Sequence, residues 1–141
     1  MQKIDKVDFI KGDLNNLDIY NKINAYFKSN VDVVLSDMAA NTSGNKNLDS
    51  YKTGQLCIDA MNLAIKILSK DGIFLSKIFM GSIFYEIDIL AKKYFKNVIK
   101  YKPLASKKDS KEIYIFCKGI LKIWYIVNKK QLNISWKKNS L

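Results

Sequence analysis

Four ionisable residues stand at the ends of segments that the sequence predicts as strands. Asp13 and Asp37 each follow a short run of apolar or β-branched residues. Lys77 interrupts an apolar strand near its end, and Glu112 begins the last predicted strand. A lysine held among carboxylates can take part in proton transfer or stabilise a developing negative charge. These residue types therefore point to a chemical site.

Strand direction brings these four residues to one edge of a sheet. Asp13, Asp37 and Lys77 lie at the carboxyl ends of predicted parallel strands, which is where open α/β sheets bind ligands. The strand that starts at Glu112 is expected to run backwards, so its beginning faces the same edge. Asp13 can also cap the following helix, Asp37 a turn, and Glu112 can be a solvated strand end. Lys77 is harder to explain structurally, because a buried lysine is costly unless it is paired.

Alternating strands and helices predict an α/β fold with a parallel sheet. Strands are expected at 7–13, 31–35, 73–79, 98–101 and 112–118, and helices at 14–27, 51–69 and 83–94. Residues 38–50 are rich in Asn, Gly and Ser and are predicted to form a loop. Lys70-Asp71-Gly72 is predicted to stop a helix and turn the chain. The connection between the last two strands is too short for a parallel crossover, so these strands should be antiparallel.

The composition is basic and apolar at once. The 141 residues include 24 Lys+Arg against 13 Asp+Glu, a formal net charge of +11, and 48% are hydrophobic. A basic chain favours polyanions such as nucleic acid or an anionic membrane, although a compositional bias toward Lys, Asn and Ile explains the same excess. No apolar run is long enough for a membrane span, and the N-terminus is not a signal peptide. A soluble cytoplasmic protein is expected.

The sequence gives little support for a metal site or a disulfide bond. The chain has no His, and its two cysteines, Cys57 and Cys117, match no metal-ligand spacing. Both lie in apolar stretches, where a free cysteine behaves as a small hydrophobic residue. No metal site is therefore predicted.

A lysine-rich loop follows the fourth strand. Its basic side chains, on the same rim as Glu112, could contact RNA phosphates; an ordinary solvated hairpin is the alternative. The candidate RNA-binding residues are Lys102, Lys107, Lys108 and Lys111.

Three segments resemble the FtsJ/RrmJ methyltransferases. The run 33–44, VVLSDMAANTSG, resembles their SDMAPNxSG signature, and 76–81, SKIFMG, resembles their VKVFQG segment. Lys102-Pro103, followed by SKEIY at 110–114, resembles their KPxxSRxxSxExY ending. Order and separation also match over about residues 4–119. The resemblance implies a Rossmann-like S-adenosylmethionine-dependent methyltransferase sheet, which the family orders 3-2-1-4-5-7-6.

The family uses a Lys-Asp-Lys-Glu tetrad to methylate an RNA ribose 2′-hydroxyl. The resemblance places Asp37, Lys77 and Glu112 in the last three positions of that tetrad. It also implies that Asp37 and Asp13 contact the cofactor, with Asp13 at its adenine end. The SDMA form points to large-subunit ribosomal RNA, with a uridine as the acceptor. The carboxylates should favour the charged form of Lys77, which is a poor base, whereas a nearby sulfonium opposes that form. Lys77 can thus be either the proton acceptor or a cation that steers the oxygen.

The family's cofactor loop, DLGxxPGGWSQ, and the first lysine of the tetrad have no counterpart in this sequence. We therefore expect an N-terminally truncated methyltransferase domain at 1–119 that lacks the first two strands, followed by an extra tail at 120–141. The strand at 7–10 should then pair with 31–35 or lie loosely. The alternatives are a non-catalytic RNA-binding remnant and one half of a split enzyme with a separately encoded N-terminal half.

Overall fold

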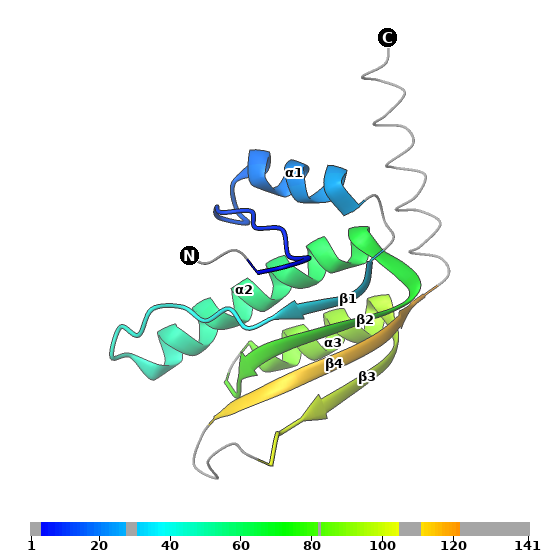
Figure 1. Cartoon of the computed structure of the whole chain (residues 1–141). Coiled ribbons are helices and arrows are strands. Elements are labelled where there is room, and N and C mark those ends of the chain that lie inside the picture. The colour runs from blue at the N-terminus through cyan, green and yellow to red at the C-terminus, as the bar shows by residue number, and fades with distance from the viewer. Residues whose placement is uncertain (1–3, 28–30, 82, 105–110, 122–141) are drawn as a thin grey trace.

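The computed structural model describes residues 4–27, 31–81, 83–104 and 111–121 of the chain. These residues form one four-stranded sheet with helices packed on one side (Figure 1). The elements in chain order are α1 (Leu17–Phe27), β1 (Val31–Ser36), α2 (Lys46–Ile67), β2 (Leu68–Phe79), α3 (Phe84–Tyr94), β3 (Phe95–Tyr101) and β4 (Glu112–Ile120).

The strand order is β1-β2-β4-β3, with β1 and β2 parallel and β4 antiparallel to both of its neighbours. The predicted antiparallel last strand is therefore confirmed. The order corresponds to strands 4-5-7-6 of the methyltransferase sheet. This is the α/β, Rossmann-like sheet expected from the sequence, without its first strands among the described residues.

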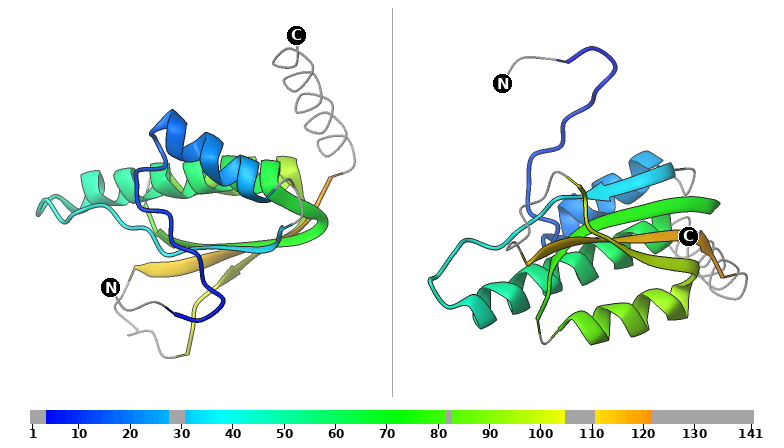
Figure 2. Two further views of the ribbon diagram at one scale, coloured as in Figure 1. Left: turned by 45° about the horizontal axis from the view of Figure 1, so that its top comes forward. Right: turned by 90° about the horizontal axis from the view of Figure 1, so that it is seen from below.

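One face of the sheet is covered by α2 and α3, with α1 lying beside α2 on the same side (Figure 2). Strand residues that point to this side alternate with exposed or half-buried neighbours, as the pleat requires. Phe74 of β2 and Phe95 of β3 stack with ring centroids 6.2 Å apart. Together with the helices they form a core of fully or almost fully buried side chains, among them Cys57, Met61, Ala64, Phe74, Ile78, Ile87, Ile115 and Cys117. The two cysteines are free and buried, as predicted.

The opposite face, here called the open face, carries an apolar row across all four strands. The ladder pairs Leu35 with Leu75, Leu75 with Phe116, and Phe116 with Ile99. Leu35 is 70% exposed and Ile99 is 58% exposed, although both stand in strands. No described helix lies on this side of the sheet (Figure 2).

The predicted strand at Val7–Ile10 is wrong. Residues 7–11 have no regular structure, and Figures 1 and 2 show residues 4–16 running outside the sheet beside its β1 edge. A strand needs a partner ladder to satisfy its backbone groups, and β1 pairs only with β2 among the described residues. Of the two expected placements, lying loosely is the one observed.

The structure also corrects both ends of the long helix. It begins at Lys46, five residues before the predicted start, because the Asn45 side chain accepts hydrogen bonds from the amides of Asn47 and Leu48. It ends at Ile67, and Lys70-Asp71-Gly72 lies within β2 instead of forming a turn.

These residues form an irregularity in the β1–β2 ladder. Val31 pairs with Leu68 and Val33 with Ile73, so several residues of β2 are accommodated opposite one residue of β1. Gly72 lies in a crowded position there, because a Cβ atom would lie 2.8 Å from Leu68 Cδ2 and 3.0 Å from the Ser69 carbonyl oxygen.

In the part of the chain that the structure describes, no helix is long and apolar enough to cross a bilayer. The predicted tail at 120–141 falls almost wholly outside the described residues, which end at Leu121.

Candidate functional site

An ion pair joins the ends of the two parallel strands. Asp37 directly follows β1, and Lys77 lies two residues before the end of β2, so parallel pairing brings them to one edge. Lys77 Nζ lies 3.3 Å from Asp37 Oδ1, with the lysine side chain 14% exposed and the carboxylate 75% exposed. The pair therefore presents a solvent-facing carboxylate and a largely buried cation.

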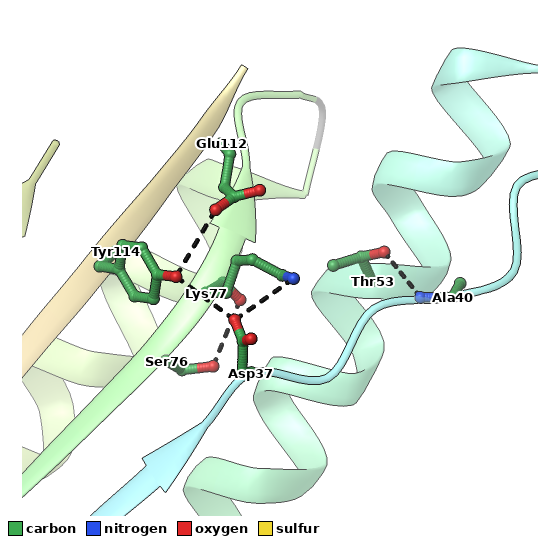
Figure 3. Close-up of polar contacts among 7 residues, drawn as sticks. All are labelled: Asp37, Ala40, Thr53, Ser76, Lys77, Glu112 and Tyr114. Atoms are coloured by element: carbon green, nitrogen blue, oxygen red, sulfur yellow. Dashed lines mark hydrogen bonds and ion pairs between the residues drawn. The ribbon is translucent and has the colours of Figure 1, made fainter. Parts of the chain in front are cut away.

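Tyr114 connects this pair to Glu112. The antiparallel ladder places Tyr114 directly opposite Lys77 and Glu112 opposite Phe79, so all of these side chains share the open face. The Tyr114 hydroxyl lies 3.3 Å from Asp37 Oδ1 and 3.5 Å from Glu112 Oε1. Figure 3 shows the side chains of Asp37, Lys77, Glu112 and Tyr114 turned toward one another. Partial burial and the negative charges of Asp37 and Glu112 raise the pKa of Tyr114, so its hydroxyl stays protonated and donates.

The loop after Asp37 is fastened to α2. The Ala40 N–H donates to Thr53 Oγ1 at 3.1 Å, and Thr53 is fully buried (Figure 3). Further along, both oxygens of Asp49 accept from Ser43, which lowers the pKa of that carboxyl. These contacts hold the Asp37 backbone in place from the helix side.

A pocket of about 240 Å³ opens beside Asp37 at the end of β1. Its wall is mostly apolar, with Leu14, Val34, Met38 and Leu63 among the lining residues. Ser36 also lines it, and the Ser36 hydroxyl is buried without a hydrogen-bond partner among the described residues. An apolar slot with one carboxylate and one unpaired hydroxyl suits a flat, partly polar ring.

Asp13 lies apart from the Asp37–Lys77 pair. It does not end a strand; its Oδ1 accepts from the Asn15 N–H at 2.9 Å and so stabilises the turn before α1. Burial raises the pKa of Asp59 on α2, and the negative charge of Asp13 raises it further. Leu14, the next residue, lines the pocket beside Asp37, whereas Asp13 itself does not.

The predicted RNA-binding lysines divide into two groups. Lys107 and Lys108 lie outside the described residues. Lys102 is exposed after β3, and Lys111 stands immediately before β4, where its carbonyl accepts from the Met80 N–H at 3.0 Å. Lys111 is thus fixed next to Glu112 by the backbone.

Sequence reasoning missed Tyr114 as part of the site. The alternation of a strand places residue 114 on the same face as residue 112, and this signal was available once Glu112 had been singled out. Among the described residues, no three Cys, Asp or Glu side chains gather as a metal site would require.

The sheet order, with β4 antiparallel to its neighbours, is that of a Rossmann-like methyltransferase fold. The FtsJ-like methyltransferase family matches residues 1–120, and the chain belongs to that family. The chain is 52% identical over 118 residues to the ribosomal RNA large subunit methyltransferase E of Pelagibacter ubique, covering 84% of this chain and 58% of that protein. It is 38% identical to the same-named protein of Hyphomonas neptunium over 84% of this chain and 51% of that protein.

A solved structure supports the same fold. A Plasmodium falciparum protein described as a ribosomal RNA methyltransferase superposes with a TM-score of 0.71 at 27% identity, covering 86% of this chain and 68% of that chain. The chain thus spans little more than half the length of the curated relatives it matches.

Proposed function

We propose that this chain supplies the acceptor side of an S-adenosylmethionine-dependent RNA ribose 2′-O-methyltransferase that acts on large-subunit ribosomal RNA. The observation that carries the proposal is the Asp37–Lys77–Tyr114–Glu112 cluster, which three strands assemble at one edge of the sheet. Its relatives are named ribosomal RNA large subunit methyltransferase E, which supports the substrate class.

Lys77 is the central group of the proposed mechanism. A ribose 2′-hydroxyl placed at Lys77 Nζ would carry its developing negative charge beside the ammonium while its proton passes to Asp37. The new oxygen–methyl bond would form as the sulfonium–methyl bond breaks, with S-adenosylhomocysteine as the leaving group. The Asp37 Oδ1 atom lies 3.3 Å from Lys77 Nζ and forms an ion pair with it. This geometry favours Lys77 as a steering and stabilising cation over Lys77 as the first proton acceptor.

Asp37 and Glu112 orient the site. The Tyr114 hydroxyl stays protonated and can donate its one proton to either Asp37 or Glu112, which limits the side-chain freedom of both carboxylates. Asp37 remains exposed enough to receive the proton or to hold the acceptor hydroxyl in line. The four groups thus position and polarise one oxygen.

The cofactor would lie in the pocket beside Asp37. S-adenosylmethionine supplies an electrophilic methyl group on a sulfonium. The apolar wall, the unpaired Ser36 hydroxyl and the carboxylate of Asp37 fit the nucleoside part of such a molecule. Asp13 precedes the lining residue Leu14, and we propose that it contacts the adenine end of the cofactor.

The remaining part of the fold would come from polypeptide beyond the matched region. The relatives extend well past it, and the open face of the sheet carries exposed Leu35 and Ile99 beside the site. We propose that a helical layer, in the same polypeptide or encoded separately, covers this face and contributes the glycine-rich cofactor loop.

Mapping 2′-O-methylation of ribosomal RNA in cells with and without this chain tests the proposal. One large-subunit site should lose its methyl group when the chain is absent, and Lys77→Ala should lower methylation by about 100-fold or more. Lys96→Ala, an exposed lysine at the start of β3, is the matched control and should keep full activity.

Unchanged methylation after removal of the chain would refute the enzymatic proposal. Calorimetry then identifies the alternative: RNA binding without any heat of S-adenosylmethionine binding indicates a non-catalytic RNA-binding protein.

A further inference from the structure

A second pocket, of about 260 Å³, lies where the N-terminus of α2 meets the end of β2 and the start of β4. Lys46 and Lys111 line it from opposite elements, and Phe79 and Met80 contribute apolar surface. None of these residues belongs to the Asp37–Lys77–Tyr114–Glu112 cluster.

The pocket is positively charged on two sides. Within the described ranges, neither Lys46 nor Lys111 forms an ion pair. Lys111 is held in place because its carbonyl accepts from the Met80 N–H at 3.0 Å. The positive end of the α2 dipole adds to this potential. An anion is the ligand that this charge distribution favours.

A buried hydroxyl in the pocket wall has no partner. Ser50 is only 7% exposed, and its Oγ makes no hydrogen bond among the described residues. Gly81, another lining residue, faces it so closely that a Cβ there would lie 2.1 Å from Ser50 Oγ. An unsatisfied buried hydroxyl is destabilising, and a ligand oxygen reached by rotation of the serine side chain would give it a hydrogen-bond partner.

One carboxylate also borders the pocket, but it is already engaged. Both oxygens of Asp49 accept from Ser43, at 3.0 Å and 3.1 Å from the amide, and the Ser43 hydroxyl lies at 2.7 Å. Asp49 is therefore directed at the loop after β1, and the two lysines dominate the pocket.

The pocket adjoins the proposed acceptor site. Phe79 pairs with Glu112 across the ladder, Lys111 precedes Glu112, and Lys77 lies two residues before Phe79, roughly 7 Å along the strand. A chain of nucleotides with one ribose at Lys77 would thus place a neighbouring nucleotide at this pocket.

We propose that the pocket binds a nucleotide that flanks the methyl-acceptor nucleotide, with its phosphate between Lys46 and Lys111 and a hydrogen bond from Ser50. The apolar surface of Phe79 and Met80 would contact the sugar or base. This inference rests on the proposed function and assigns part of the RNA path to residues outside the catalytic cluster.

The test is an NMR titration of the 141-residue chain with uridine 5′-monophosphate and, separately, with uridine. The monophosphate should shift the amides of Lys46, Asn47 and Lys111, whereas uridine should shift them much less. Ser50→Ala, which fits the same space, should weaken the effect.

Binding of a short single-stranded RNA is measured in parallel by fluorescence anisotropy at several salt concentrations. Lys46→Gln combined with Lys111→Gln should weaken binding about tenfold and reduce the log–log salt slope by about 0.7 for the lost phosphate contact. Lys70→Gln combined with Lys96→Gln removes the same two charges at exposed positions elsewhere, and it should leave both quantities nearly unchanged.

Equal shifts from uridine and its monophosphate would overturn the phosphate assignment. An unchanged affinity and salt slope in the double variant would overturn the pocket as part of the RNA path. Neither result touches the proposed function, because Lys77→Ala is scored by methyl transfer and the lysine variants by RNA binding.

Discussion

The two faces of the sheet differ sharply although they are built from the same strands. On the helix-covered face, Phe74, Ile78, Ile115 and Cys117 are completely buried. On the open face, Leu35 remains 70% exposed although it pairs with Leu75. The catalytic candidates also stand on the open face, next to this apolar row.

The sequence of β2 indicates that the two faces of the sheet have different structural roles. The segment 73–79 of β2 is apolar at five of its seven positions, on both faces of the strand, a pattern typical of strands that are buried on both sides. The described helices bury only one side. The covered face therefore stabilises the chain, whereas the open face is suited to receive another layer, which would also enclose the site.

We expect the largest difference in stability between two matched variants, one with an isoleucine of the covered face replaced and one with an isoleucine of the open face replaced. Ile78→Ala on the covered face should lower the free energy of unfolding by about 2–5 kcal/mol, because it leaves a cavity in the core. Ile99→Ala on the open face should cost less than about 1 kcal/mol, because that side chain is 58% exposed. Urea denaturation measures both, and similar losses would contradict the asymmetry.

The two thiols of the covered face give the chain a distinct alkaline sensitivity. Burial raises the pKa of Cys57 to about 11; burial, with the nearby Cys57 thiol and Asp88, raises that of Cys117 to about 12. An unfolded thiol ionises near about 8.5. The stabilisation from neutral thiols is thus complete below that pH and is lost as pH rises toward 11 to 12.

Stability should fall by roughly 1.4 kcal/mol per pH unit for each thiol above about pH 9. The combined variant Cys57→Ala and Cys117→Ala is the control, because its tyrosines and lysines titrate as before. Urea denaturation measures the free energy of unfolding of both proteins as a function of pH. If it falls equally in the two proteins above about pH 9, the buried thiols are not the cause.

Thr53→Val tests the fastening of the site loop to the covered side. The Ala40 N–H would lose its acceptor, which should cost about 1–3 kcal/mol. Thr42→Val, at an exposed position, should have almost no effect on unfolding. Methyl transfer should also fall in Thr53→Val, because the Asp37 backbone would be less well held.

Leu35→Ser should give the smallest change in stability, less than about 0.5 kcal/mol, because the side chain is mostly exposed. Its effect should instead appear in self-association, since β1 is an exposed edge strand with an apolar side chain. Light scattering should show less aggregation for the variant. If the variant aggregates as much as the unsubstituted chain, Leu35 on the open face does not drive self-association.

Much of this arrangement was predictable from residue patterns. The β-branched run before Asp37 and the apolar run around Lys77 predicted β1 and β2, and the short last connection predicted the antiparallel β4. Strand direction then predicted that Asp37, Lys77 and Glu112 share an edge. Local pattern sufficed because each strand pairs within this chain.

The errors arose where partners or caps decide the structure. Val7–Ile10 has a strand-like composition but no ladder to join among the described residues. Asn45 lies in an Asn-rich segment whose composition is typical of a loop, although its side chain caps α2. Gly72 was interpreted as a turn residue, although it serves an irregular part of β2.

That irregularity between Leu68 and Ile73 gives the site a tolerance to changes in length. A slip of one residue in a strand turns every side chain to the opposite face, and Lys77 would then point into the helices. Because the extra residues are taken up beside Val31 and Val33, the regular ladder from Val33 to Ser36 keeps its phase. A change in the number of residues between Leu68 and Ile73 would therefore leave Lys77 facing Asp37.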